Sequence, residues 1–387
     1  MAQLVKLGDV CTVVSGSTPK TSVEEYWNGD VKWITPAELD SDSYYVYDTV
    51  KHISELGRTK TGLSYMPEGT VILSSRAPIG KTAIAGCKMC CNQGFKNLIC
   101  SDRINNRYLY YFFKGKTEFL NSLGRGATFK EISKSIVENI EIPLPSLNEQ
   151  REISEKFARV DEQLNLRKKQ LQKLDELVKS RFIELFGKVG TDDKGWGLSR
   201  LGNCCIINPK KSDDNRLTQD LMVSFVPMPS VSEKGEIDAS EIKSYNDVKS
   251  GFTYFAENDV LFAKITPCME NGKGAVAKGL SNGIGFGSTE FHVLRPINGT
   301  SDPHWLYAVT TFKQFRIDAA NNMTGSAGQR RVPASFLEAY KVSVPPIDLQ
   351  NEFATFVEQT DKLKFEVKEA LEKLETLKKS LMQQYFG

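Results

Sequence analysis

Two long segments with the same hydrophobic pattern, 200 residues apart, constrain the fold of this chain more than any other feature. In residues 146–187, and again in residues 348–387, apolar side chains recur every three or four positions, which places them in one stripe along an α-helix. Ser146 with Glu149 offers a capping box at the start of the first segment, and Asn148 is an equally good cap. The pattern predicts two amphipathic helices, each about 58 Å long at 1.5 Å per residue. A helix of that length needs a partner.

The two helical segments belong to an internal repeat without gaps. A shift of 200 places Pro145 on Pro345 and Gln150 on Gln350, and the match continues through the leucines of both segments. Leu349 stands where the first helix has an acidic residue, so the second helix is expected to be capped differently. The residues predicted to form the core between the helices are Ile153, Phe157, Val160, Leu164, Leu171, Leu174, Val178, Phe353, Val357, Leu363, Val367, Leu371, Leu374 and Leu381.

The segments outside the helices repeat each other in outline. Short β-like runs separated by Gly, Pro and Asn dominate both, and residues 107–119 predict a helix. LVKLGDVCTVV in the first segment resembles LSRLGNCCIIN in the second, whereas the loops diverge. We predict an α+β fold in which two mixed α/β domains, residues 1–147 and 188–347, alternate with long helices over residues 148–187 and 348–387. Two scaffold copies with unlike loops form a pseudo-two-fold object, and duplex DNA is the natural two-fold ligand.

Composition sets limits on the class of protein. The 387 residues carry a net charge of only +2, so nucleic-acid binding cannot be argued from bulk charge. The sequence has no apolar run of the length of a membrane span and no signal-peptide core at its start, which predicts a cytoplasmic protein. The eight cysteines are interpreted as reduced thiols. Cys87 and Cys90 form a CxxC spacing, but none of the three histidines has matching spacing, so we predict no metal site.

One loop resembles a phosphate-binding motif. Residues 75–82 match a P-loop at Gly80, Lys81 and Thr82, but Ser75 replaces its first glycine and Pro78 removes an amide donor. We interpret the stretch as a loop that presents Ser75, Arg76 and Lys81 to DNA, while a solvated surface loop remains the alternative. Nucleotide binding is a further alternative.

Other loops carry side chains suited to DNA. Residues 264–273 hold Lys, Thr and Asn at a tip framed by Pro and Gly, and basic or amide side chains precede each long helix. For the adjacent arginines before the second helix, phosphate contact and a structural ion pair are equal alternatives. The predicted DNA-binding residues are Arg76, Lys81, Asn92, Gln93, Arg125, Lys130, Lys264, Thr266, Asn271, Lys273, Gln329, Arg330 and Arg331.

No catalytic motif is apparent in the sequence. Amino-methyltransferases carry an Asx-Pro-Pro-aromatic motif, but Pro345 and Pro346 lie between Val344 and Ile347. Histidine is too scarce to predict a Ser/His/Asp triad, and no acidic cluster suggests a nuclease metal site. The chain is therefore predicted to have no catalytic activity by itself.

Five stretches stand out beside the repeat: IPLPSLNEQREI, VSVPPIDLQNEF, KITPCMENGK, GSTEFHVLRP and GSAGQRRVP. Together with the repeat, they make the whole chain resemble the specificity subunits of type I restriction-modification systems. The resemblance implies that the helices pair antiparallel as a coiled coil, set a spacing and dock two methylation subunits, with residues 167–169 as candidates for that contact. It implies that each domain reads half of a bipartite, asymmetric site in double-stranded DNA, for defence against phage.

The same resemblance accounts for the missing catalytic motifs. It places S-adenosylmethionine on the methylation subunits, and ATP and Mg with the restriction subunits, and it implies no cofactor on this chain. Two alternatives stay open: a coiled-coil adaptor that does not read DNA, and a nucleotide-binding, DNA-modifying enzyme built around residues 75–82.

Overall fold

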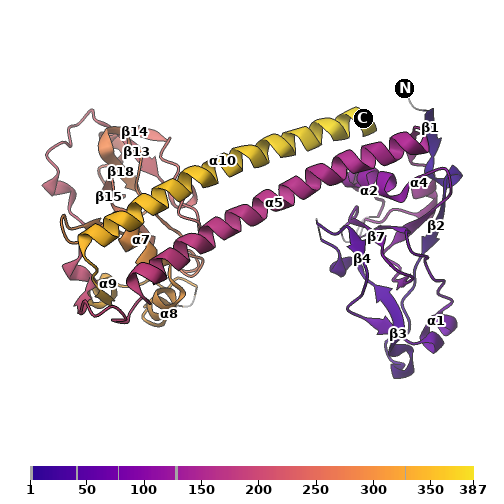
Figure 1. The fold of residues 1–387 in the computed structure, drawn as a ribbon, viewed down its shortest axis with the longest axis horizontal. Coiled ribbons are helices and arrows are strands. Elements are labelled where there is room, and N and C mark those ends of the chain that lie inside the picture. The colour runs from indigo at the N-terminus through magenta and orange to yellow at the C-terminus, as the bar shows by residue number, and fades with distance from the viewer. Residues whose placement is uncertain (1–2, 41, 77, 127–129, 327) are drawn as a thin grey trace. The chain divides into compact units, whose positions relative to one another are not determined.

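The chain folds into two compact units, each made of one globular region and half of each long helix. The computed structural model describes residues 3–40, 42–76, 78–126, 130–326 and 328–387. The first unit comprises Met1–Lys168 and Glu369–Gly387, and the second comprises Lys169–Lys368. The long helices are α5 (Leu147–Phe186) and α10 (Ile347–Phe386) (Figure 1). Both predicted helices are thus confirmed to within two residues at each end.

The predicted capping signals of α5 are also confirmed. The hydroxyl and amide of Ser146 both donate to the Glu149 carboxylate, at 2.7 and 2.9 Å, and the Glu149 amide donates to Ser146 Oγ at 3.3 Å. This is a capping box with Ser146 as the cap. At the other end Gly187 has a φ of 79°, the left-handed conformation that glycine adopts at little cost.

The described residues of the first unit form three sheets. Its main sheet has the order β2-β9-β6-β7-β4, and it is accompanied by the sheets β5-β3-β8 and β1-β10. The strands are β1 (Gln3–Lys6), β2 (Cys11–Ser15), β3 (Trp27–Ile34), β4 (Tyr45–Val46), β5 (His52–Ile53), β6 (Val71–Leu73), β7 (Thr82–Ala85), β8 (Cys90–Cys91), β9 (Lys96–Cys100) and β10 (Glu141–Leu144). The helices are α1 (Glu55–Thr61), α2 (Asn106–Lys114), α3 (Thr117–Leu123) and α4 (Lys134–Glu138).

The helix predicted over residues 107–119 is two helices, α2 and α3. Gly115 ends α2, and glycine in a helix interior costs about 1 kcal/mol relative to alanine. A Cβ added at Gly115 would lie 2.8 Å from the sulfur of Met382 in α10. The break therefore falls where a neighbouring helix comes too close for a side chain.

The second unit repeats this plan. Its main sheet has the order β12-β19-β16-β17, which matches β2-β9-β6-β7, and β11 pairs with β20 as β1 pairs with β10. Its third sheet has the order β14-β13-β18-β15. The strands are β11 (Leu198–Arg200), β12 (Cys205–Ile207), β13 (Met222–Val226), β14 (Ile242–Ser244), β15 (Thr253–Ala256), β16 (Val260–Ala263), β17 (Gly274–Val276), β18 (Ile284–Gly287), β19 (Phe291–Pro296) and β20 (Lys341–Ser343). The helices are α6 (Tyr245–Val248), α7 (Pro303–Thr311), α8 (Lys313–Asn321) and α9 (Ala334–Ala339).

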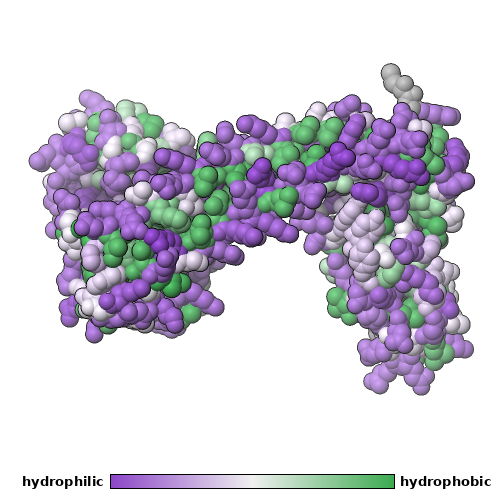
Figure 2. All heavy atoms as spheres, in the orientation of Figure 1, coloured by the Kyte–Doolittle hydropathy of each residue, from purple (hydrophilic) through white to green (hydrophobic). Residues whose placement is uncertain are grey.

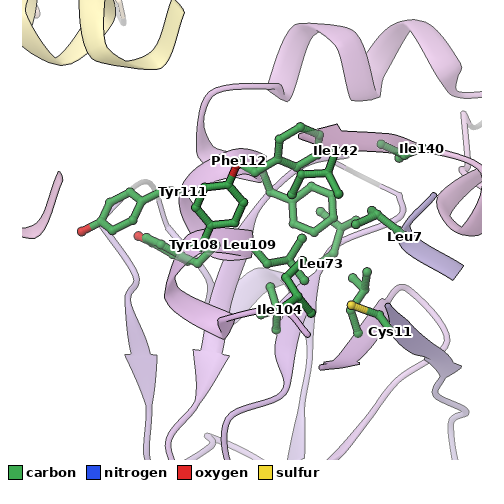
Figure 3. Close-up of a cluster of buried hydrophobic side chains, with 14 of the residues drawn as sticks. Leu7, Cys11, Leu73, Ile104, Tyr108, Leu109, Tyr111, Phe112, Ile140 and Ile142 are labelled. Carbon is green, nitrogen blue, oxygen red and sulfur yellow. The ribbon is translucent and has the colours of Figure 1, made fainter. Parts of the chain in front are cut away.

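Aromatic side chains from both long helices complete the core of each unit. In the first unit, α2 directs Tyr108, Leu109 and Phe112 into a cluster with residues of the sheets (Figure 3). Phe157 near the start of α5 stacks on Phe386 at the end of α10, with ring centroids 5.8 Å apart. In the second unit, the end of α5 and the start of α10 meet in the same way through the aromatic rings of Phe182, Phe186 and Phe353. The predicted antiparallel pairing of the helices is thus confirmed.

A buried glutamine fastens the start of each long helix to its globular region. The side chain of Gln150 accepts a hydrogen bond from the main-chain amide of Asn105 at 2.8 Å and donates to the main-chain carbonyls of Arg103 and Pro145. Gln350 makes the equivalent three bonds with the main chain of Asp302, Thr300 and Pro345. Both glutamines are fully buried, and Asn105 and Asp302 cap α2 and α7. The match at this position of the repeat therefore marks a shared joint.

Most of the predicted core residues of the helix pair are at least half-buried, and Leu363 is the exception. Ile153, Phe157, Val160, Leu164, Phe353 and Val367 are buried, and Leu171, Leu174, Val178, Val357, Leu371, Leu374 and Leu381 are half-buried. Leu363 is 49% exposed, so its prediction was wrong. Thr360 is buried instead, and Lys364, with 18% of its side chain exposed, pairs with Asp175. Positions 360 and 364 keep the three-and-four spacing that position 363 breaks.

Candidate nucleic-acid interface

Three loop segments come together at the same place in each unit. In the first unit, the Ser75 amide donates to the Gly94 carbonyl at 2.8 Å, and the Ile132 amide donates to the Ser75 carbonyl at 3.0 Å. In the second unit, Lys264 makes the same two main-chain bonds with Glu290 and Val332, both at 2.9 Å. We call these sites loop cluster 1 (residues 74–81, 92–94 and 125–132) and loop cluster 2 (residues 264–273, 288–290 and 324–332). Residues 77, 127–129 and 327 lie outside the described residues.

The two units also share the β-bridges made by the segment that precedes α4 in the first unit and α9 in the second. Glu131 forms β-bridges with Arg76 and Arg125, and Arg331 forms β-bridges with Ile265 and Thr324. Glu131 and Arg331 are separated by the same 200 residues as the long helices. The two clusters therefore share a backbone frame and carry different side chains on it.

Loop cluster 1 presents a half-exposed arginine. The Arg76 guanidinium has no hydrogen-bond or ion-pair partner among the residues described, and a Cβ at Gly94 would lie 3.5 Å from its Nε. Among the described residues, Ser75 Oγ is the buried side-chain atom that lacks a hydrogen-bond partner. Arg125 and Lys130 are exposed. Cluster 1 thus leaves the predicted DNA-binding residues Arg76, Arg125 and Lys130 accessible, Arg76 less so than the other two.

The two amide residues predicted in cluster 1 make local contacts. Asn92 Oδ1 accepts a hydrogen bond from the Gly94 amide at 2.9 Å, which closes a turn, and Gln93 accepts one from the hydroxyl of Thr18. Gln93 is exposed and Asn92 is half-buried. Asn92 therefore shapes the loop beside Arg76.

The predicted lysines Lys81 and Lys273 occupy equivalent structural positions. The Lys81 ammonium donates to the carbonyls of Pro36 and Leu39, around a short 3-10 helix, Pro36–Glu38. The Lys273 ammonium donates to the Met228 carbonyl at 3.3 Å, at the corresponding 3-10 helix, Met228–Ser230. These contacts engage both ammonium groups inside the units. They favour a bracing role over the predicted DNA contact.

Loop cluster 2 is organised by an ion pair. Arg331 Nε and Nη2 donate to the two carboxylate oxygens of Glu290 at 2.9 and 2.7 Å, the bidentate geometry that suits this pair. The hydrogen bond from Arg331 holds the pKa of Glu290 below its ordinary value. Lys264 lies beside the pair, and burial lowers the pKa of Lys264. For Arg331, the structural ion pair is confirmed.

The remaining predicted residues of cluster 2 differ in their availability. Thr266 Oγ1 donates to Glu270 at 2.9 Å. Asn271, Gln329 and Arg330 are exposed, and within the described ranges the Arg330 guanidinium has no ion-pair partner. Arg330 and Arg331 are adjacent in sequence but in unlike environments.

Sequence reasoning singled out Arg331 but missed its partner Glu290, and in the first cluster it missed the pair Lys96 and Glu131. Lys96 at the start of β9 pairs with Glu131 at 3.0 Å, so the segment before α4 carries the negative charge of its ion pair. In the second unit the segment before α9 carries the positive charge, on Arg331. The shift of 200 that aligned the helices would have placed Glu131 on Arg331, had it been extended upstream.

The enzyme alternative finds little support in the local geometry. A phosphate-binding loop directs its amides at the ligand from the N-terminus of a following helix, but Thr82 opens strand β7. No group of three or more His, Cys, Asp or Glu in the described ranges could hold a metal ion. Burial raises the pKa of Cys90 to about 11. Within the described part of the chain, no helix combines the length and apolar character needed to cross a membrane.

Comparison with known proteins identifies related sequences along most of the chain. A family model described as "Type I restriction modification DNA specificity domain" matches residues 2–176 and 193–378. The chain is 39% identical over 247 residues to the type I restriction enzyme MjaIX specificity subunit of Methanocaldococcus jannaschii, covering 59% of this chain and 56% of that protein. It is 44% identical over 161 residues to the EcoAI specificity subunit of Escherichia coli, covering 40% and 26%. The alignments thus span about half or less of these relatives.

Two solved structures share the fold over nearly the whole chain. The crystal structure of the type I restriction-modification S subunit from M. genitalium gives a TM-score of 0.56 at 15% identity, covering 100% of this chain and 96% of that one. A chain solved for complex assembly and conformational transition of the type I R-M system gives 0.60 at 20% identity, covering 99% and 97%. At such identities the likeness concerns the fold alone.

Proposed function

Because the chain belongs to the family of type I restriction modification DNA specificity domains, we propose that it is the non-catalytic, DNA-reading subunit of a restriction-modification complex. Each unit reads one half of a bipartite, asymmetric site in double-stranded DNA. The observation that carries the proposal is the pair of loop clusters, which share main-chain hydrogen bonds and differ in the side chains they present. A repeated frame with unlike side chains suits two half-sites of different sequence.

The long helices set the spacing between the half-sites in this proposal. Each helix has 40 residues and is about 60 Å long at 1.5 Å per residue. Half-sites read from one face of DNA lie roughly 34–36 Å apart, which helices of that length can span.

The outer faces of the helices are the proposed docking surface for two methylation subunits. Large apolar side chains are exposed there among charged ones (Figure 2). They include Leu166, Leu177, Ile183, Leu363, Phe365 and Leu377. Contiguous apolar surface marks protein interaction sites, and the proposal is that these side chains contribute to such a surface. The methylation subunits would bring S-adenosylmethionine, and restriction subunits would bring ATP and Mg, in a cytoplasmic complex.

Exchange of one globular region tests the independence of the two units. Replacing residues 1–147 by another recognition domain, in a complex reconstituted with cognate methylation subunits, is expected to change one half-site and leave the other half-site and the spacing intact. Methylated sites in a randomised duplex library report both. A change in both half-sites would show that the units do not read independently.

Matched insertions test the role of the helices. One extra heptad in α5 and one at the paired position of α10 add about 10 Å of helix and preserve the apolar stripe. The spacing is expected to grow by about three base pairs at 3.4 Å each, with both half-sites unchanged. An unchanged spacing would remove the helices from this role.

The two alternatives make different predictions. A coiled-coil adaptor would give a complex without sequence preference, whereas two separated protected segments in a DNA footprint would exclude it. A nucleotide-binding enzyme built on residues 75–82 would bind ATP or S-adenosylmethionine as a purified chain. Calorimetry is expected to detect neither.

A further inference from the structure

The guanidinium of Arg331 has its donors divided between two tasks. An arginine carries five N–H donors in a rigid plane. Three of them are engaged: Nε and Nη2 donate to Glu290, and Nη1 donates to the Gln329 carbonyl at 3.1 Å. One donor on Nη1 and one on Nη2 remain. Since 42% of the Arg331 side chain is exposed, this remaining pair is open to a ligand.

The surroundings fix the direction of these two donors. The main chain of Arg331 forms β-bridges with both Ile265 and Thr324, so the root of the side chain is held in the frame of cluster 2. The carboxylate of Glu290, only 25% exposed, holds the far end through two bonds. A guanidinium anchored at both ends loses little further freedom when it binds, which makes its contact selective.

We propose that Arg331, oriented by Glu290, reads a guanine in the half-site of the second unit through the O6 and N7 atoms of that base. This rests on the proposed DNA-reading function. Two parallel N–H donors match the two acceptors of guanine in the major groove, and arginine with guanine is the commonest specific contact there. Glu290 is a positioning residue, and its charge offsets one of the two cations Lys264 and Arg331, so the cluster keeps a net positive charge beside DNA.

The neighbouring arginine and the first unit provide contrasts. Arg330 is exposed and, among the described residues, held by no ion pair, so it takes the role of a phosphate contact, which adds affinity without sequence preference. In the first unit the equivalent position is Glu131, paired with Lys96. The inference therefore concerns the second half-site alone.

Four variants of the full chain, each in the reconstituted complex, test the proposal. They are Arg331→Lys, Glu290→Ala, Glu290→Gln and, as the matched control, Arg330→Ala. Sites methylated in a randomised duplex library give the base preference at every position, and the exchange of residues 1–147 identifies the second half-site. Preference at the first half-site serves as the internal check that each variant is folded.

The wild-type complex is expected to require a G·C pair at one position of the second half-site. Arg331→Lys should lower the preference for that pair about 10- to 100-fold, since one bidentate contact is worth about 1–3 kcal/mol of discrimination. Glu290→Ala should lower it at the same position because the guanidinium is released, and Glu290→Gln, which can still accept one bond, should lower it less. Arg330→Ala should weaken binding to all sequences alike and reduce the salt slope by about 1.

Two outcomes would overturn the inference while the proposed function stands: a second half-site without any required G·C pair, or an Arg331→Lys effect as uniform across sequences as that of Arg330→Ala. Unchanged preference in Glu290→Ala would remove Glu290 from its positioning role. A wild-type complex with no preference at either half-site would instead contradict the proposed function itself.

Discussion

In the first unit Glu131 pairs with Lys96, whereas in the second unit the residue 200 positions later, Arg331, pairs with Glu290. The surrounding backbone is alike in both: equivalent isolated β-bridges, the same main-chain hydrogen bonds and the same order of four strands in the main sheet. What the two units share therefore belongs to the scaffold, and where they differ, the difference is a candidate for reading DNA. The internal repeat allows equivalent positions of the two units to be compared within one chain.

The largest effect is expected at the shared glutamines. Gln150→Ala removes three hydrogen bonds to main-chain groups and, at about 1 kcal/mol for each bond, should lower the free energy of unfolding by about 3 kcal/mol. Gln350→Ala should cost a similar amount. Urea denaturation with hydrogen exchange read separately for each unit measures both, with the exposed Gln163→Ala as control. If Gln350→Ala left the free energy of unfolding unchanged, the second joint would not be equivalent to the first.

A smaller effect is expected where the second helix departs from the first. Val367 is buried in the helix pair, so Val367→Ala should cost about 2 kcal/mol through lost burial and a residual cavity. Leu363, 49% exposed, should tolerate alanine with a change within about 0.5 kcal/mol. The midpoints of thermal unfolding of the two variants show whether the core between the helices contains Val367 without Leu363, as observed, or also includes Leu363. A larger cost for Leu363→Ala would restore the prediction from the sequence.

The bracing lysines should affect stability and leave DNA reading unchanged. Lys81→Met and Lys273→Met keep the aliphatic stem but lose the hydrogen bonds to main-chain carbonyls, which should cost about 1 kcal/mol each. Base preference and salt dependence of the complex are expected to stay as in the wild type. A salt slope reduced by about 1 in either variant would make that lysine a phosphate contact, and would break the division between scaffold and reading residues.

The smallest effect on stability is expected at Arg76, which is assigned to DNA reading and not to the scaffold. In contrast to the two lysines, its replacement should change DNA binding and leave stability nearly unchanged. Arg76→Ala removes a half-exposed side chain with no partner among the described residues, so the free energy of unfolding should stay within about 0.5 kcal/mol of the wild type. Binding should weaken through contacts at the first half-site only. Titration of duplexes in which either half-site is scrambled separates the two effects. Equal weakening through both half-sites would contradict the assignment of Arg76 to the first unit's reading surface.

Local and periodic features were predictable from the sequence, and contacts between distant segments were not. Hydrophobic spacing predicts the helices, and the chemistry of Ser146 predicts the cap. The family resemblance implies the antiparallel pairing of the helices. Leu363 was wrongly assigned to the core between the helices because it is the apolar residue nearest to the positions taken by Thr360 and Lys364. The ion pair with Asp175 allows Lys364 to lie in that core.

The loop residues show a second limit. Lys81 looked like a tip residue because it follows a glycine in a motif, and only the fold brings the carbonyls of Pro36 and Leu39 to its ammonium. Glu290 carried no signal of its own, since its role depends on an arginine 41 residues away. The repeat did contain a usable sign, because the lysine before β7 recurs before β17, as a scaffold residue should.

The joints at Gln150 and Gln350 have a consequence for how such a chain changes over time. The hydrogen bonds of the two glutamine side chains all go to main-chain atoms. Main-chain groups are the same whichever amino acids carry them, so the attachment of a globular region does not depend on its side chains at those points. Loops can accumulate substitutions, or a whole region can be replaced by recombination, without loss of the fastening. The loops proposed to read DNA can therefore change while the helices and their joints remain unaltered.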